Sequence, residues 1–203
     1  MLIFIMNTLL TLLVSFMAFS QDQQSLVIIG DSLTEGYGVE ASQSYPALLQ
    51  NKLKAQGYNW KVISHGISGS TSASAVSRVK WILKNPPKIV ILALGANDGL
   101  RGLKPESTKK NLDSAIVLLK ENKIKVFLSA MKVPPNYKGG QYIQKFESLY
   151  PELAKKQSII LLPFILKNVA GRSELNLPDG IHPNALGHDI IANDLVSQLK
   201  DYL

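Results

Sequence analysis

The feature that most constrains the fold is an alternation of short apolar runs with longer amphipathic stretches. The clearest run is KIVILAL at residues 88–94, which is typical of a strand buried on both faces of a sheet. Strands that alternate with helices of this length predict a parallel sheet with helices on both faces. Because such crossovers are right-handed, we expect a doubly wound, three-layer α/β/α sandwich with five mostly parallel strands. The expected strands are residues 26–30, 60–64, 88–94, 124–129 and 158–162, and the expected helices are 45–56, 72–83, 105–122, 141–156 and 184–203.

The first twenty residues differ from the rest, because they carry no charged side chain and are mostly Leu, Ile, Phe, Met and Val. Ala18 and Ser20 place small residues before Gln21 as in an A-x-A-like cleavage site, although no Lys or Arg precedes the apolar run. We therefore expect residues 1–20 to be a cleaved signal peptide of a periplasmic or secreted protein, and residues 21–203 to form a single domain. A retained membrane anchor is the alternative, since the run is close to the roughly 20 residues that span a bilayer.

Charge and cysteine content narrow the functional classes. The formal charge of +7 lies wholly in residues 21–203, and the lysines are scattered over predicted helices and helix ends. That pattern is more typical of a solvated face than of a nucleic-acid-binding surface, so we expect no nucleic-acid partner and at most peripheral membrane contact. The chain contains no cysteine, which excludes disulfides, a catalytic thiolate and cysteine-ligated zinc. We expect a monomer.

A serine stands where the first predicted strand ends. The apolar run at residues 26–30 stops abruptly at Gly-Asp-Ser-Leu, residues 30–33. This predicts a buried strand that delivers Ser32 to the carboxyl edge of the sheet, where ligands of open α/β sheets bind. Ser32 is therefore a candidate nucleophile, which would need a base, an orienting acid and an oxyanion hole. A helix cap or a turn is the alternative role for this serine.

Two further strands also end in polar, glycine-containing segments. The segment at residues 64–71, SHGISGST, follows the second strand, and its glycines would let a backbone N–H approach developing negative charge. Asn97, in the segment GANDG after the third strand, offers an amide donor at the same edge. Ordinary turns are the alternative for both segments, and anion binding is a further one for residues 66–71. His65 is expected to be a structural or surface residue outside the site.

An acid and an imidazole near the C-terminus are separated by two residues. Asp179 and His182 are flanked by prolines, so the carboxylate can set the orientation of the ring, as a catalytic triad requires. The order Ser, Asp, His matches the α/β-hydrolases, but Ser32 lacks their G-x-S-x-G motif. A zinc site made of Asp179, His182 and His188 is the alternative, and it lacks an obvious further ligand. His188 is expected to pack or cap a helix.

Together these motifs resemble the GDSL, or SGNH, hydrolase family, which has a flavodoxin-like fold. The resemblance rests on Gly-Asp-Ser-Leu at residues 30–33, a glycine after the second strand, Gly-x-Asn-Asp at 95–98 and Asp-x-x-His at 179–182, in this order. Residues 95–102 and 135–137 resemble its bacterial multifunctional branch, which has acyl-CoA thioesterase, lysophospholipase and arylesterase activities.

The resemblance implies a role for each motif residue. Ser32 would be the nucleophile, His182 the base and Asp179 its partner. The oxyanion hole would consist of the N–H groups of Ser32 and Gly69 and the side chain of Asn97. The chain departs from the family at residues 64–65, Ser-His, where relatives often have Asn-Ala, and at Ser70, where an acidic residue is common.

The expected activity is that of a serine esterase without cofactor or metal, acting on carboxylic esters or thioesters of acyl chains. The expected partner is a small-molecule acyl ester or a lysophospholipid. The Pro- and Gly-rich segment at residues 131–140 is expected to contact the substrate. A carbohydrate acetylesterase, or a non-catalytic acyl-lipid carrier on the same fold, are the alternatives.

Overall fold

Five parallel strands form one sheet, in the order β2-β1-β3-β4-β5, in the computed structural model, which describes residues 23–134 and 139–203. Each strand lies at a position predicted from the apolar runs, so the predicted parallel sheet is confirmed. β3 is buried along its whole length, as its uninterrupted apolar sequence requires. The strands are β1 (Gln24–Gly30), β2 (Trp60–Gly66), β3 (Ile89–Ala93), β4 (Lys125–Ser129) and β5 (Ile160–Leu162).

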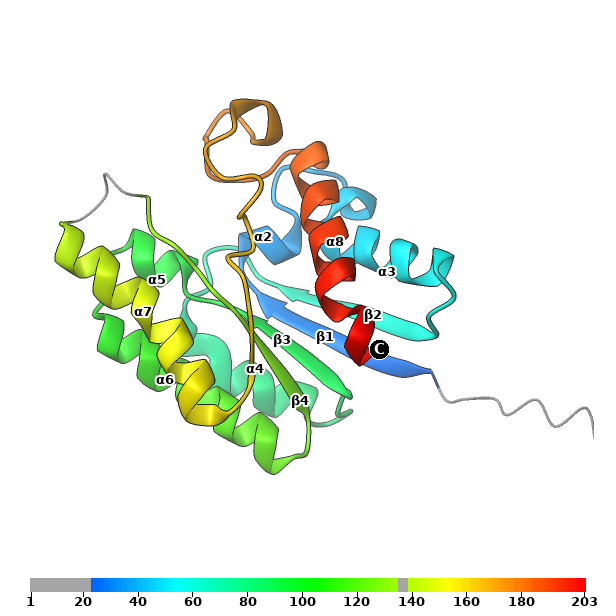
Figure 1. Ribbon diagram of the computed structural model, residues 1–203, viewed down its shortest axis with the longest axis horizontal. Helices are drawn as coiled ribbons and strands as arrows, with labels where there is room; N and C mark the ends of the chain where they lie inside the picture. The colour runs from blue at the N-terminus through cyan, green and yellow to red at the C-terminus, as the bar shows by residue number, and fades with distance from the viewer. Residues whose placement is uncertain (1–22, 135–138) are drawn as a thin grey trace, which may run out of the picture.

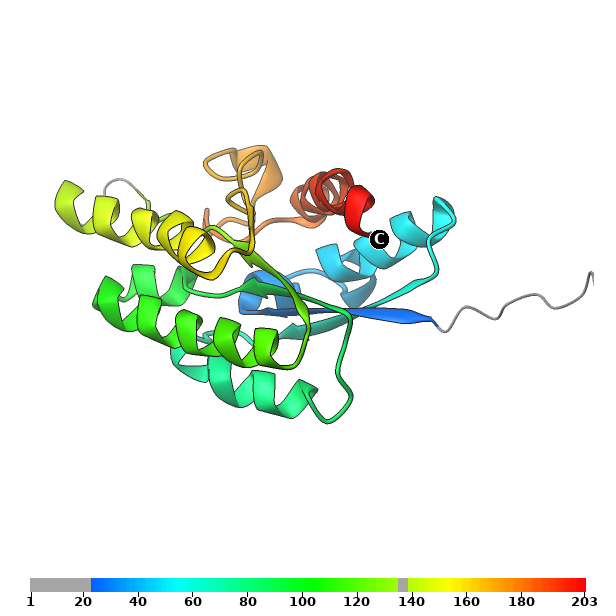
Figure 2. The ribbon, with the colours of Figure 1, turned by 60° about the horizontal axis from the view of Figure 1, so that its bottom comes forward.

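Helices cover both faces of the sheet, which confirms the three-layer sandwich. Helices α3 and α8 pack together on one face, and α6 lies between α4 and α7 on the other (Figures 1 and 2). This division follows from right-handed crossovers between parallel strands. The long helices are α3 (Tyr45–Ala55), α4 (Ala75–Ile82), α6 (Pro105–Glu121), α7 (Gly140–Gln157) and α8 (Ala185–Leu199).

The structure adds two short helices, α2 (Ser32–Glu35) and α5 (Ala96–Leu100), directly after β1 and β3. Periodicity does not reveal them, because each is shorter than two turns. Asp31 caps α2 by accepting a hydrogen bond from the Leu33 N–H at 3.1 Å, and Gly36 ends it in the left-handed conformation. Ser32 is therefore the first residue of a helix, so the capping role considered for it belongs to Asp31.

The strand register brings the polar segments to one edge. Gly30 pairs with Gly66 on β2 and with Ala93 on β3, so these three strands end at the same level. A side chain at Gly66 would collide with the backbone of Glu35, which shows how closely α2 approaches the end of β2. This edge therefore collects the segments that follow β1, β2 and β3.

One core of buried apolar side chains joins both faces of the sheet. The expected signal peptide, residues 1–20, lies outside the described residues, as do residues 135–138 of the segment expected to contact substrate. Within the described ranges, none of the helices combines the length and apolarity that crossing a bilayer requires.

Candidate active site

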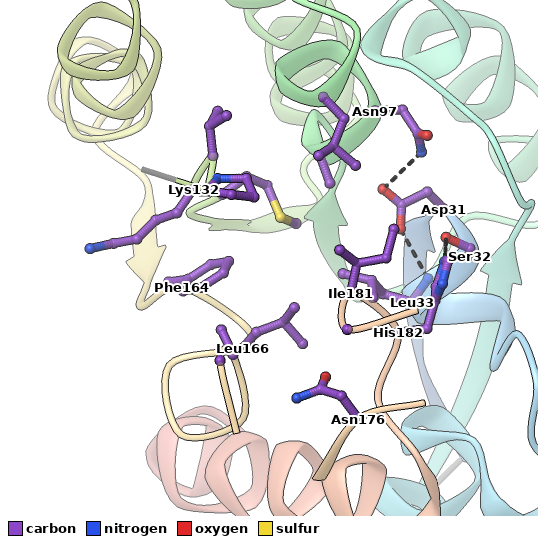
Figure 3. A pocket seen from close by; sticks show the side chains of 18 residues that line it. Asp31, Ser32, Leu33, Asn97, Lys132, Phe164, Leu166, Asn176, Ile181 and His182 are labelled. Atoms are coloured by element: carbon purple, nitrogen blue, oxygen red, sulfur yellow. Dashed lines mark hydrogen bonds between the residues drawn. The ribbon is translucent and has the colours of Figure 1, made fainter. Parts of the chain in front are cut away.

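Ser32, His182 and Asp179 lie in series at the carboxyl edge of the sheet. His182 Nε2 is 3.0 Å from Ser32 Oγ (Figure 3). On the other side of the ring, His182 Nδ1 is 2.7 Å from Asp179 Oδ2. Ser32 opens α2, whereas the other two residues come from the loop before α8, and His182 is 150 positions along the chain from the serine. The structure thus brings together the three residues that the sequence analysis proposed as a triad.

The backbone holds the carboxylate of Asp179. The N–H groups of Ile181 and His182 both donate to Asp179 Oδ1 at 3.0 Å. Partial burial by itself raises the pKa of Asp179, but the hydrogen bonds from the N–H and ring of His182 and from the Ile181 N–H outweigh it and lower the pKa to about 2. An ionised Asp179 accepts a hydrogen bond from the Nδ1–H of the ring, which leaves Nε2 free to accept the hydroxyl proton of Ser32.

Tyr37 contacts the same imidazole and was not identified from the sequence. Its ring centroid lies 4.6 Å from that of His182, at an interplanar angle of 40°. Tyr37 follows Gly36, whose left-handed conformation turns the chain back after α2. A lone exposed tyrosine in a loop gives no sequence signal, so only the structure reveals that it restricts the ring.

The three expected oxyanion donors, Ser32, Gly69 and Asn97, meet at this edge. As the first residue of α2, Ser32 has a backbone N–H without a partner inside the helix. Gly69 has φ of 75°, and its N–H donates to no acceptor among the described residues. Asn97 Nδ2 lies 3.0 Å from the carbonyl oxygen of Ser70 and 3.5 Å from Asp31 Oδ2.

An acidic residue reaches the Gly69 segment from a different element. The sequence departs from the family at Ser70, where an acid is common, but Glu35 of α2 lies against this segment. Glu35 Oε2 accepts hydrogen bonds from the N–H of Ser68, at 2.8 Å, and from the Ser68 hydroxyl. A carboxylate is therefore present beside Gly69, supplied by α2.

The other two histidines lie outside this arrangement. The ring of His65 packs against Trp81, with centroids 4.9 Å apart. His188 is fully buried, and its Nδ1 accepts a hydrogen bond from the N–H of Tyr45 at the start of α3. His188 was expected either to pack or to cap a helix, and its buried ring does both. In residues 23–134 and 139–203, no three His, Cys, Asp or Glu side chains gather in a way that could hold a metal ion.

A largely apolar cavity of about 460 Å³ opens beside Ser32. Ser32 and His182 lie on one side of it, and Phe164 and Leu166 lie across from them (Figure 3). Met131, Lys132, Val133 and Pro134, from the segment expected to contact substrate, also line it. The shape and chemistry of this cavity suit an acyl chain whose carbonyl carbon reaches the Ser32 hydroxyl.

Asp31 and His188 predict an unusual pH dependence of stability. Burial raises the pKa of Asp31 to about 6 against the opposing hydrogen bond from Leu33, whereas burial, followed by the charge of His182, lowers the pKa of His188 to about 4. As pH falls from 6.5 to 4.5, Asp31 takes up a proton more readily in the folded state than in the unfolded state, which stabilises the protein. His188 takes up a proton more readily in the unfolded state, which destabilises the protein. The two effects offset each other.

Asp31→Asn is therefore expected to expose the effect of His188. Its free energy of unfolding should fall by about 2 kcal/mol between pH 6.5 and pH 4.5, while that of the wild type changes much less. At pH 8 the variant should be the more stable protein by about 3 kcal/mol, because a buried carboxylate charge is gone. Urea unfolding at the three pH values measures this, with Asp201→Asn as an exposed control. Parallel pH profiles for Asp31→Asn and the wild type would contradict it.

A hydroxyl, an imidazole and a carboxylate joined in series at the carboxyl edge of a parallel sheet are the arrangement of a serine hydrolase on an α/β/α fold. The family model described as "GDSL-like Lipase/Acylhydrolase family" matches residues 28–190. This chain belongs to that family, whose members are ester hydrolases.

Individual relatives also support membership of this family. An arylesterase of Vibrio mimicus is 37% identical over 187 residues, covering 92% of this chain and 93% of the relative. The thioesterase 1/protease 1/lysophospholipase L1 of Escherichia coli strain K12 is 36% identical over 193 residues, covering 95% and 90% of the two chains. The crystal structure of TesA superposes with a TM-score of 0.84 at 35% identity, covering 89% of this chain and 100% of that one.

Proposed function

We propose that this chain hydrolyses carboxylic esters or thioesters of acyl chains, with Ser32 as nucleophile, His182 as base and Asp179 as the partner of His182. The observation that carries the proposal is the series of two hydrogen bonds from Asp179 through His182 to Ser32, at the wall of an apolar cavity. The activities in the names of relatives, arylesterase and thioesterase or lysophospholipase, support small ester substrates.

The reaction follows from these positions. Ser32 Oγ attacks the carbonyl carbon while its proton passes to His182 Nε2, and Asp179 stabilises the imidazolium that forms. The oxyanion receives hydrogen bonds from the N–H groups of Ser32 and Gly69 and from Asn97 Nδ2. His182 then returns the proton to the leaving alcohol or thiol, and water releases the acyl group from Ser32 by the same steps.

The substrate places its acyl chain in the cavity and its leaving group toward solvent. A lysophospholipid or a comparable amphipathic ester meets both requirements. The uncharged, apolar residues 1–20 support export to the periplasm or beyond. Sequencing the N-terminus of the protein recovered from its host tests this, because a chain that begins at Met1 would contradict a cleaved signal peptide.

Hydrolysis of p-nitrophenyl esters from acetate to palmitate tests the activity. Each methylene buried in the cavity contributes about 0.8 kcal/mol, so kcat/KM should rise by up to about fourfold per added carbon until the cavity is full. Absence of hydrolysis by protein with a native circular dichroism spectrum would overturn the proposal. Binding of a fluorescent fatty acid without hydrolysis would then favour the acyl-lipid carrier.

Phe164→Ala is expected to shift this chain-length profile. Removing a ring from the cavity wall should lower kcat/KM for octanoate and longer esters by about tenfold and leave acetate hydrolysis nearly unchanged, since acetate does not reach that wall. Val117→Ala, an exposed apolar residue of α6 outside the cavity, is the matched control. An equal loss on acetate and octanoate would show that Phe164 does not contact the acyl chain.

A further inference from the structure

The segment that carries Gly69 is joined at three points to helix α5 and to Arg101, the residue that follows it. Arg101 Nη2 donates to the Gly69 carbonyl at 3.0 Å, and Asn97 Nδ2 donates to the Ser70 carbonyl at the same distance. Asp98 Oδ2 accepts from the Ser72 N–H at 2.8 Å. Two of the expected oxyanion donors, the Gly69 N–H and the Asn97 amide, thus lie on segments that are joined directly to each other.

Asp98 is buried, with 1% of its surface exposed. Besides the Ser72 N–H, its carboxylate accepts from the Ser72 hydroxyl at 2.5 Å and from the Thr108 hydroxyl at 3.0 Å. Asn111 of α6 donates a hydrogen bond from its Nδ2 to the Ser72 hydroxyl oxygen at 3.0 Å. No Lys or Arg pairs with Asp98 within the described ranges, so neutral donors alone hold this buried carboxylate.

The position of Asp98 separates it from the reacting atoms. It does not line the cavity beside Ser32, although Asn97, its neighbour in the chain, does. Its side chain points instead to the segment that follows Gly69, where it accepts two hydrogen bonds from one residue, Ser72. Because one oxygen of Asp98 accepts from the Ser72 N–H and the other from the Ser72 hydroxyl, the contact fixes both the position and the orientation of the segment at Ser72.

We infer that Asp98 is a positioning residue, which holds the Gly69 N–H at a fixed separation from the Asn97 amide so that both reach the oxyanion. The inference rests on the proposed function. An oxyanion hole acts through donors that are in place before reaction, at about 2.7–3.1 Å from the developing charge. Because Asp98 is next to one donor in the chain and bonded to the segment of the other, its loss should lower kcat and leave substrate binding intact.

Asp98→Asn tests this, since an amide keeps the size of the side chain but turns an NH2 group toward donors. Removing an oxyanion donor outright costs about 10²–10³-fold in kcat, and we expect a displaced donor to cost about 30-fold, with KM within about twofold. The pH dependence of kcat/KM should keep its midpoint, because Ser32 and His182 are untouched. Thr108→Val is the matched control: it removes one hydrogen bond from the same carboxylate without contacting the Gly69 segment.

Ser72→Ala covers the case in which Asp98→Asn does not fold. It removes one of the two hydrogen bonds at the segment and should lower kcat by about fivefold, again without raising KM. The inference is overturned if Thr108→Val lowers kcat as much as the folded Asp98→Asn or Ser72→Ala variant, or if the loss falls on KM. A wild-type protein without esterase activity would overturn the proposed function itself, whereas an active wild type with unaffected variants overturns only this inference.

Discussion

Ser32→Ala is expected to lower kcat/KM for p-nitrophenyl butyrate by at least about 10⁴-fold. The methyl group leaves no nucleophile 3.0 Å from His182 Nε2, and an oxyanion hole without a nucleophile supports only the residual attack by water. Steady-state rates measured over a wide range of enzyme concentration quantify the loss.

The same variant should fold normally. Ser32 is half-buried at the edge of the sheet, and its side chain has His182 as its one hydrogen-bond partner in the part of the chain that the structure describes. We therefore expect the free energy of unfolding to change by no more than about 0.5 kcal/mol. A folded Ser32→Ala protein with more than one-hundredth of the wild-type activity would show that another residue or a water molecule attacks the ester.

Asp179→Asn is expected to lower kcat by about 10³–10⁴-fold. Asp179 fixes the imidazole by accepting from Nδ1 at 2.7 Å, and an asparagine amide there can donate instead, which favours the tautomer with a proton on Nε2. That tautomer cannot accept the hydroxyl proton of Ser32. The rate of the variant should stay below that of the wild type at every pH from 5 to 9. The pKa of about 2 keeps the wild-type carboxylate ionised over this range, and the amide of the variant does not titrate.

Asp189→Asn provides the comparison for Asp179→Asn. Asp189 is a partly exposed aspartate of α8 that pairs with Lys52, and losing such a surface ion pair costs about 0–1 kcal/mol of stability. Its kcat should stay within about twofold of the wild type. An Asp179→Asn variant that is no slower than Asp189→Asn would mean that His182 is held by other contacts, of which the Tyr37 ring is the first to test.

Local sequence patterns were sufficient to predict the fold and to predict which residues come together at the site. The run at residues 88–94 is apolar because β3 has helices on both of its faces, and the alternation of strands with helices determines parallel pairing. Parallel strands end at one edge, so the polar residues that follow β1 and β3, Ser32 and Asn97, were expected near each other. The pair Asp179 and His182 is separated by two residues, so its contact is also a local one.

Tertiary structure decided what depends on residues far apart in the chain. The distance from Ser32 to His182, the cavity wall at Phe164, and the contacts of Glu35 with Ser68 and of Asp98 with Ser72 all join separate elements. The raised pKa of Asp31 likewise comes from the packing around it, because burial penalises the charged form of any carboxyl group. A sequence specifies local conformation through the periodicity of its own residues, whereas distances, cavities and pKa values arise only when several segments exclude water from the same place.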